Sequence, residues 1–351
     1  MNLRRDQVND AGGILGATIE YFYLDHESRP SLGAIHAERF CSDDKIIAAI
    51  GFANSEVTLA GQGALADCGL ALVVEVSTNP NITLENPGTT FRVSGRDDRQ
   101  GPMGAIYAAN TLGWTKTVVV DDQSAFGRAA ADAFEDTFKG LGGEVLKREA
   151  IRRGDKDVRA AIRAMPEIDF VYYCGLAPDA ATWVQQMREL GRDEPLLGCD
   201  GVYSVEDYIT ASGGAALEGG GSYNCAGTGP TGIKAALAFE AAYIEEYGPI
   251  PILAQLYYDA AFVLLAAIER AAIQTGAIPT RSEVVESLKL TAGITSVGFG
   301  TPVSFNKAGD NTGALYSCFI AEGDPDSFTF LETLTAGEVE ATMRAAGVEP
   351  K

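Results

Sequence analysis

The chain has 351 residues, of which 48 are acidic and 27 basic, so its formal net charge is −21. This length predicts two or three domains, and 46% hydrophobic against 21% charged residues excludes general disorder. The acidic balance argues against nucleic acids and anionic membranes as partners, because both would be repelled. The longest apolar run, Ile252–Ile268, is interrupted by Gln255 and Asp259 and predicts a buried helix, not a membrane span.

Strand-like and helix-like patterns alternate over the first two thirds of the chain. Short apolar, β-branched runs predict strands, and the segments between them have apolar faces of period 3.6, which predict helices. Such repeated units predict parallel sheets covered by helices on both faces. The predicted strands are 17–24, 45–51, 70–76, 116–122, 143–150, 168–175 and 194–201, and the predicted helices are 32–40, 56–66, 101–112, 127–141, 157–165 and 179–190.

The pattern changes after residue 224. Three helical patterns follow one another there, and only short strand-like runs come after them. These runs are too few for an independent sheet, so we expect the chain to cross back and forth between two α/β domains. The late helices are predicted at 233–247, 252–274 and 282–290, and the late strands at 302–306, 314–321 and 327–331.

Catalytic sequence motifs are scarce. The chain has two histidines, His26 and His36, and no GxSxG, HExxH or Walker A motif. A literal GxGxxG occurs at Gly227–Gly232, but two predicted helices follow it and no strand does, which argues against a dinucleotide site. We interpret that segment as a connection between domains, and we expect neither a cofactor nor an enzyme.

The six cysteines show neither a CxxC motif nor metal-ligand spacing, so no metal site is expected. We interpret them as buried thiols, because several lie within apolar runs. A disulfide between Cys174 and Cys199, which end consecutive predicted strands, is the alternative. The six are Cys41, Cys68, Cys174, Cys199, Cys225 and Cys318.

Two strand-to-helix junctions are candidate ligand-binding positions. Ser55 follows one predicted strand, and Ser77 and Thr78 follow the next. In open parallel sheets, ligands bind at the carboxyl ends of strands, where helix N-termini favour an anion such as a carboxylate. The structural alternative is that Ser55 caps a helix and that Ser77 and Thr78 form a Ser/Thr turn.

Asp200 ends a predicted strand in the second half of the chain. A carboxylate in this position could pair with a cation, although an isolated Asp-Gly dipeptide usually marks only a turn. Hydroxyls and amides for an anion in one domain, with a carboxylate for a cation in the other, would form a site for a zwitterion. An amino acid is such a ligand.

Eight further segments are informative in their order and spacing: 11–14 (AGGI), 48–58 (AAIGFANSEVT), 76–80 (VSTNP), 93–102 (VSGRDDRQGP), 121–127 (DDQSAFG), 169–175 (DFVYYCG), 196–201 (LLGCDG) and 300–313 (GTPVSFNKAGDNTG). In these segments the sequence resembles the class I periplasmic solute-binding proteins of ABC transporters, of the leucine/isoleucine/valine-binding type. The resemblance extends over nearly the whole chain.

The resemblance implies specific roles for residues of the first lobe. The hydroxyl and amide of Ser55 would bind the α-carboxylate of an amino acid. The amide of Thr78 would join them, and its hydroxyl would accept a hydrogen bond from the ammonium group. Val76 would contribute its backbone carbonyl, and Ser77 belongs to the same turn.

The second lobe would contribute Asp200, Phe126 and Leu176. The resemblance implies that Asp200 pairs with the ammonium group, where the family usually has Glu. Phe126 stands where the family often has Tyr, and Leu176 lies near a second replaced tyrosine. Both differences make the pocket wall more apolar and favour a branched-chain or other apolar amino acid.

The implied fold consists of two Rossmann-like lobes with parallel sheets, of the periplasmic-binding-protein-like I type, joined by three hinge crossovers. Lobe 1, which docks the carboxylate, would comprise 1–96 and 227–313, and lobe 2, which closes, 97–226 and 314–351. The family's first strand and a signal peptide are expected to precede Met1.

The resemblance implies an extracytoplasmic, periplasmic binding protein of an ABC importer that closes over an amino acid by hinge bending. Its partners would be the ligand and the membrane subunits of the transporter, with no nucleic acid and no dinucleotide, and the protein is expected to be a monomer. The alternatives are a binding protein for amides, urea or aromatic carboxylates, and a cytoplasmic ligand sensor of the same fold.

Overall fold

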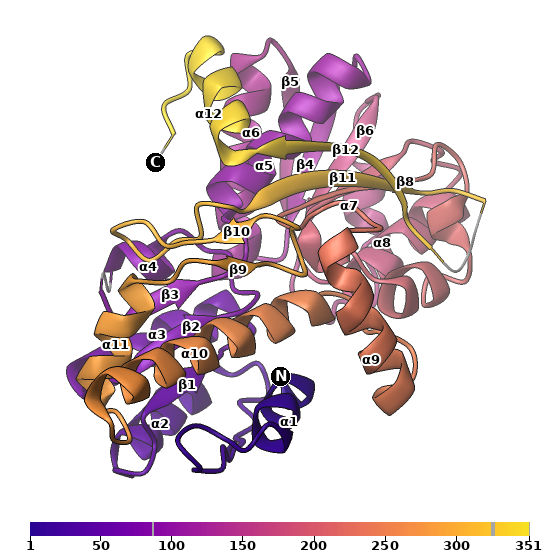
Figure 1. The fold of residues 1–351 in the computed structure, drawn as a ribbon. Helices are drawn as coiled ribbons and strands as arrows, with labels where there is room; N and C mark the ends of the chain where they lie inside the picture. Colours follow the sequence, from indigo (N-terminus) through magenta and orange to yellow (C-terminus); the bar gives the residue numbers. More distant parts are fainter. Residues whose placement is uncertain (86–87, 324–326, 351) are drawn as a thin grey trace. The chain divides into compact units, whose positions relative to one another are not determined.

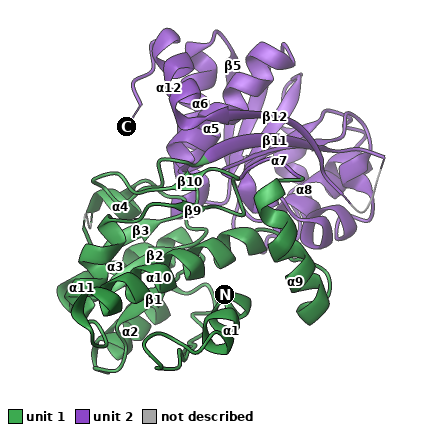
Figure 2. Cartoon of the chain, viewed as in Figure 1, with its two compact units in different colours: residues 1–95, 232–314 green, residues 96–231, 315–351 purple. Residues whose placement is uncertain are grey.

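The computed structural model describes residues 1–85, 88–323 and 327–350 (Figure 1). The chain folds into two compact units, unit 1 with residues 1–95 and 232–314 and unit 2 with residues 96–231 and 315–351 (Figure 2). The chain passes between them at 95/96, 231/232 and 314/315, compared with 96/97, 226/227 and 313/314 in the sequence-based division. The predicted mixed α/β class with two lobes is confirmed.

Unit 1 is built on a parallel sheet of three described strands in the order β1-β2-β3. The side chains of β2 alternate between two cores, as a strand buried on both faces requires. Leu72 and Val74 pack in a core with residues of α2 and α3, and Ala71 and Val73 in a core with α10 and α11. The bounds are β1 Ala48–Ile50, β2 Ala71–Val74, β3 Thr90–Arg92, α2 Pro30–Cys41, α3 Ser55–Asp67, α10 Ala254–Thr275 and α11 Arg281–Lys289.

The strand predicted at 17–24 is not formed, and this prediction was wrong. A strand needs a neighbour for its backbone groups, and residues 17–24 pair with no strand in the described chain. Instead, the Asn9 side chain bonds both backbone groups of Ile19, at 2.8 and 2.9 Å. An apolar cavity of about 370 Å³ lies within unit 1, lined in part by 17–23 and 45–50.

The rest of unit 1 is peripheral to its sheet. Helix α1 contacts α10, and α4 packs near α3 and β3. A short antiparallel pair, β9 and β10, precedes the third crossover. Helix α9 follows the second crossover. The bounds of these elements are α1 Asn2–Asp10, α4 Asn81–Glu85, α9 Leu237–Tyr247, β9 Ile294–Thr295 and β10 Pro302–Val303.

Unit 2 contains a sheet of seven described strands in the order β12-β11-β8-β7-β6-β4-β5. The strands from β4 to β8 are parallel, whereas β11 and β12 are antiparallel to their neighbours. The two C-terminal strands therefore join this sheet and form none of their own, as expected. The bounds are β4 Lys116–Asp121, β5 Glu144–Ala150, β6 Phe170–Cys174, β7 Leu196–Gly198, β8 Ser222–Ala226, β11 Leu315–Ala321 and β12 Thr329–Thr335.

Helices cover both faces of the unit 2 sheet. Tyr172 packs in one core with α5, α6 and α12, and its neighbour Tyr173 packs in the other with α7 and α8. None of the helices in the described part of the chain has the length and hydropathy that a membrane span requires. The bounds are α5 Asp97–Ile106, α6 Ala125–Gly140, α7 Arg159–Arg163, α8 Ala177–Glu189 and α12 Ala336–Ala345.

The six cysteines form three disulfides, so the interpretation as buried thiols was wrong. The pairs are Cys41–Cys68, Cys174–Cys199 and Cys225–Cys318. Cys174 and Cys199 come at the ends of the adjacent strands β6 and β7, with Cα atoms 5.4 Å apart. Cys225 and Cys318 lie opposite each other on β8 and β11. Strand pairing brings the thiols of these last two pairs together, and the alternative of a Cys174–Cys199 disulfide is confirmed. Cys41 ends α2 and Cys68 follows α3, so the remaining pair joins two helices.

Candidate functional site

The candidate residues of unit 1 lie at the carboxyl end of β2 and the start of α3. Ser55, Ser77 and Thr78 are all at most 2% exposed. The Asn79 amide donates to the Ser55 hydroxyl at 3.3 Å, which ties the turn after β2 to the first turn of α3. The structure therefore brings these predicted residues together within unit 1.

The side chain of Ser77 is engaged inside unit 1. Its hydroxyl lies 2.8 Å from the Thr58 hydroxyl, and both hydroxyls also donate to the backbone carbonyl of Phe52. Ser77 thus fixes the shape of the turn. In contrast, the described chain gives the neighbouring Thr78 hydroxyl no hydrogen-bond partner.

Arg92 supports this turn from β3 and was not identified from the sequence. Its Nη1 donates to the carbonyls of Asn79 at 2.7 Å and Ser77 at 3.3 Å. The side chain is completely buried and pairs with Asp310. An arginine within the apolar segment TFRV was the available signal, but no strand was predicted there.

The electrostatics at this end of unit 1 suit an anion. The first amides of α3 have no acceptor within the helix, and the helix dipole favours negative charge at its N-terminus. The nearby Glu75, which sequence reasoning also missed, is 3% exposed. Burial raises the pKa of Glu75 to about 7. A hydrogen bond with its own backbone and the positive charge of the chain's N-terminus partly oppose this rise. At neutral pH, a large fraction of the molecules therefore has Glu75 protonated, and a protonated Glu75 does not repel an anion as a carboxylate would.

The candidate residues of unit 2 lie at the carboxyl ends of three neighbouring strands. Phe126 is in the first turn of α6 after β4, Leu176 is the N-cap of α8 after β6, and Asp200 follows β7. Gly201 packs so closely that an added Cβ would lie 2.9 Å from Phe126 Cε1 and 2.3 Å from the Gly175 carbonyl oxygen. This close packing brings the three candidates together.

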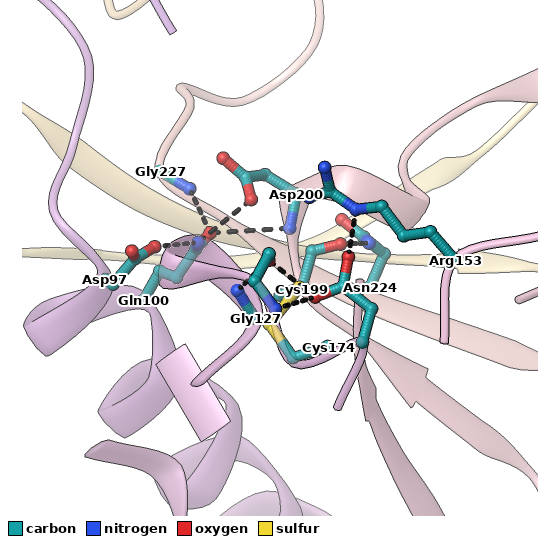
Figure 3. The surroundings of a disulfide bond; sticks show 11 residues. Asp97, Gln100, Gly127, Arg153, Cys174, Cys199, Asp200, Asn224 and Gly227 are labelled. Atoms are coloured by element: carbon teal, nitrogen blue, oxygen red, sulfur yellow. Dashed lines mark hydrogen bonds and ion pairs between the residues drawn. A yellow bond between two sulfur atoms is a disulfide. The ribbon is translucent and has the colours of Figure 1, made fainter. Parts of the chain in front are cut away.

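Asp200 lies in a polar cluster around the Cys174–Cys199 disulfide (Figure 3). Its Oδ1 accepts a hydrogen bond of 2.9 Å from Nε2 of Gln100, a residue that the sequence analysis did not identify. Burial raises the pKa of Asp200 to about 6, while the Gln100 bond and nearby backbone amides oppose this rise. The carboxylate is mostly ionised at neutral pH and can pair with a cation.

The other sequence motifs give no competing site. Gly227–Gly232 spans the second crossover, and the described segment after it forms α9 and α10 with no strand between them. No group of three or more metal-ligating side chains occurs among residues 1–85, 88–323 and 327–350. Unit 1 thus offers groups suited to an anion and unit 2 a carboxylate suited to a cation. The ligand contacts of the seven predicted residues, Val76 among them, remain predictions.

The sequence matches the family described as periplasmic binding protein over residues 1–324. The chain belongs to this periplasmic binding protein family. An "Amino acid binding protein" of Pseudomonas aeruginosa is 32% identical over 216 residues, which cover 61% of this chain and 58% of that protein. The matched region thus spans less than two thirds of that relative's length.

Two solved structures have a similar fold. The leucine-binding protein LivK of Thermotoga maritima has a TM-score of 0.85 and 28% identity, over 96% of this chain and 93% of that chain. LivJ of Streptococcus pneumoniae, a branched-chain amino acid transporter substrate-binding protein solved with isoleucine, has a TM-score of 0.84 and 25% identity. That similarity covers 95% of this chain and 92% of LivJ.

Proposed function

We propose that this protein binds an α-amino acid with an apolar, branched side chain. The observation that carries the proposal is the complementary chemistry of two strand-end sites. Unit 1 presents the α3 N-terminus, which suits a carboxylate, and the Thr78 hydroxyl, which can accept a hydrogen bond from an ammonium group. Unit 2 presents the Asp200 carboxylate, which suits the same ammonium group. The printed names of LivK and LivJ, which concern leucine and branched-chain amino acids, support this ligand class.

Binding would couple the two units through the ligand. We expect the carboxylate to dock on Ser55 and Thr78 first, and the ammonium group to engage Asp200 when the hinge closes. Val76 would accept through its backbone carbonyl, and Phe126 and Leu176 would contact the side chain. Contacts made only in the closed form would favour that form on binding.

The protein would act as a monomeric, periplasmic substrate-binding component of an ABC importer. Family membership supports this role. The three disulfides favour an oxidising compartment, because such bonds are rare in reducing cytosol. The partners would be the amino acid and the membrane subunits of the transporter, which would recognise the closed form.

A thermal-shift panel tests the proposed function. It would contain the twenty amino acids, urea, short amides and benzoate. A ligand at 100 times its dissociation constant adds about 2.7 kcal/mol of stability, which raises the melting temperature by several degrees. We expect shifts with leucine, isoleucine and valine. Shifts with amides or benzoate alone would contradict the proposal, as would a sharp melt that no compound moves.

A further inference from the structure

Gln100, in α5, makes four side-chain hydrogen bonds in unit 2. Its Nε2 donates to Oδ1 of Asp97 at 2.8 Å and to Oδ1 of Asp200 at 2.9 Å. Its Oε1 accepts from the backbone amides of Gly227 at 3.3 Å and Asp200 at 3.4 Å. Figure 3 shows the four bonds converging on this one amide from three segments of the chain.

These bonds use the complete capacity of a primary amide, which has two N–H donors and two acceptor lone pairs. The assignment of the amide ends is unambiguous, because reversing them would place an oxygen against two carboxylates and an NH₂ group against two N–H groups. The side chain is 1% exposed, so water does not replace these partners. No other residue type of this size supplies the same pattern.

The partners of Gln100 lie at functionally distinct places. Asp97 follows the first crossover of the chain at 95/96, and Gly227 precedes the second at 231/232. Asp200 is held twice, through its carboxylate and through its backbone amide. The amide of Gln100 therefore connects the proposed ammonium-binding carboxylate to the two segments through which the chain enters and leaves the first part of unit 2.

We propose that Gln100 is a positioning residue that orients the Asp200 carboxylate for ligand binding and links it to the crossover segments at Asp97 and Gly227. This inference rests on the proposed function. Gln100 bonds Oδ1 of Asp200 and does not engage Oδ2. A donated hydrogen bond favours the ionised form of a carboxyl group, so Gln100 also keeps Asp200 ionised despite its burial.

Other charged and titratable groups also lie near Asp200 and Gln100. Asp97 shares the Gln100 amide, and the buried Tyr172 lies near both carboxylates, which help to raise its pKa. Arg153 is in the same view but is engaged in an ion pair with Asp122, with Nε and Oδ2 2.6 Å apart. Among these groups, Gln100 donates directly to Asp200, so its removal should be visible in the titration of that carboxyl.

Gln100→Leu tests the proposal, with Gln186→Leu as its matched control. Gln186 is 5% exposed and also bonds backbone groups of unit 2, namely the Val158 amide and the Lys156 carbonyl, each at 2.8 Å. The Asp200 carboxyl would be titrated by ¹³C NMR in the ligand-free protein, with its signal assigned by its loss in Asp200→Asn. The affinity for L-leucine and L-isoleucine would be measured by calorimetry between pH 5 and 8.

We expect Gln100→Leu to raise the pH at which Asp200 titrates and to weaken amino-acid binding about tenfold or more at pH 7. The loss should shrink at higher pH, where Asp200 ionises in the variant too. Gln186→Leu should change neither quantity. Should Gln100→Leu not fold, Gln100→Met keeps the length of the side chain but removes its N–H donors without adding a charge, and it should move the titration in the same direction.

An unchanged Asp200 titration in a folded Gln100 variant would overturn the proposal, as would an equal effect of Gln186→Leu. The two hypotheses fail separately. If the wild-type protein binds no amino acid, the proposed function fails, while the ligand-free titration still shows whether Gln100 controls Asp200. If amino acids bind and the variant retains wild-type affinity at every pH, the positioning role alone is wrong.

Discussion

Arg92 of β3 and Asp310, which lies between β10 and the third crossover, form a buried ion pair with Nε and Oδ1 3.0 Å apart. The Arg92 side chain is completely buried and that of Asp310 is 7% exposed. Thr83 also bonds this carboxylate, at 2.9 Å. Because Arg92 donates to the carbonyls of Ser77 and Asn79 as well, the ion pair connects the proposed carboxylate-binding turn with the segment that leads out of unit 1.

Replacing Arg92 should therefore strongly destabilise the protein. In Arg92→Met, the Asp310 carboxylate keeps its hydrogen bond from Thr83 but loses its buried cation, and the carbonyls of Ser77 and Asn79 lose the hydrogen bonds from Arg92. Breaking a buried ion pair in this way costs about 3 to 5 kcal/mol. Urea unfolding at pH 7 measures the loss. The control is Arg159→Met, which breaks the surface ion pair with Glu189 and should have little effect. Similar losses in both variants would contradict the assigned role of Arg92.

Asp200→Asn should weaken amino-acid binding by at least about 30-fold, because truncating one partner of a buried charge pair costs about 2 to 5 kcal/mol. Calorimetric titration with the amino acid that gives the largest thermal shift provides the measurement. Asp193→Asn makes the same charge change at an exposed position of unit 2 and should leave the affinity unchanged. A change of less than about threefold in Asp200→Asn would be incompatible with an ammonium contact.

The affinity for the amino acid should fall in acid. Asp200 has a pKa of about 6 in the ligand-free protein, and an ammonium ligand binds its ionised form. Below pH 6 the group must release a proton on binding, so the dissociation constant should increase about tenfold for each pH unit. Between pH 7 and 8 it should change little. Titrations from pH 4.5 to 8 test this, and Asp200→Asn should lose the dependence.

Glu75 should make stability depend on pH in the opposite direction to an ordinary salt-bridged carboxylate. Its pKa is about 7 in the folded protein against 4.5 for the free side chain, so the folded state binds more protons between these values and loses stability as pH rises through them. Glu75→Gln, which resembles the protonated form, should gain about 2 to 3 kcal/mol over the wild type between pH 5 and 8.

Urea unfolding at these two pH values compares Glu75→Gln with the wild type. Glu85→Gln, at an exposed position of unit 1, is the control and should follow the wild type at both. If the difference in unfolding free energy between the wild type and Glu75→Gln is the same at pH 5 and pH 8, burial does not raise the pKa of Glu75 and the prediction is wrong.

Each disulfide should contribute to the free energy of unfolding according to the length of chain that it encloses. Cys174–Cys199 has a sequence separation of 25 and Cys225–Cys318 one of 93. Loop entropy then predicts losses of about 3.5 and about 4.6 kcal/mol when each pair is replaced by alanines. Urea unfolding of the two double variants measures these losses and shows which disulfide contributes more. The untreated protein should contain no free thiol in a denaturing thiol assay, and six reactive thiols there would contradict the pairing.

Sequence periodicity located most elements because a helix or strand that covers a core carries its own pattern. The pattern at Ile252–Ile268, with two polar interruptions, correctly indicated the buried helix α10. The strand predicted at 17–24 has an equally suitable composition, but it lacks a described neighbour to pair with. Strand formation depends on a partner elsewhere in the chain, and residue composition does not report one.

The sequence by itself determined the α/β class, the two-lobed organisation and the family, together with candidate residues at strand ends. It did so because strand alternation, helix periodicity and the order of the motifs are local properties of the chain. Only the tertiary structure decided which cysteines pair and which side chains support the candidates. Gln100 meets residues 200 and 227, and Arg92 meets residue 310. These polar contacts arise when distant strands become neighbours, and a buried side chain must then satisfy its hydrogen bonds with whatever the fold places beside it.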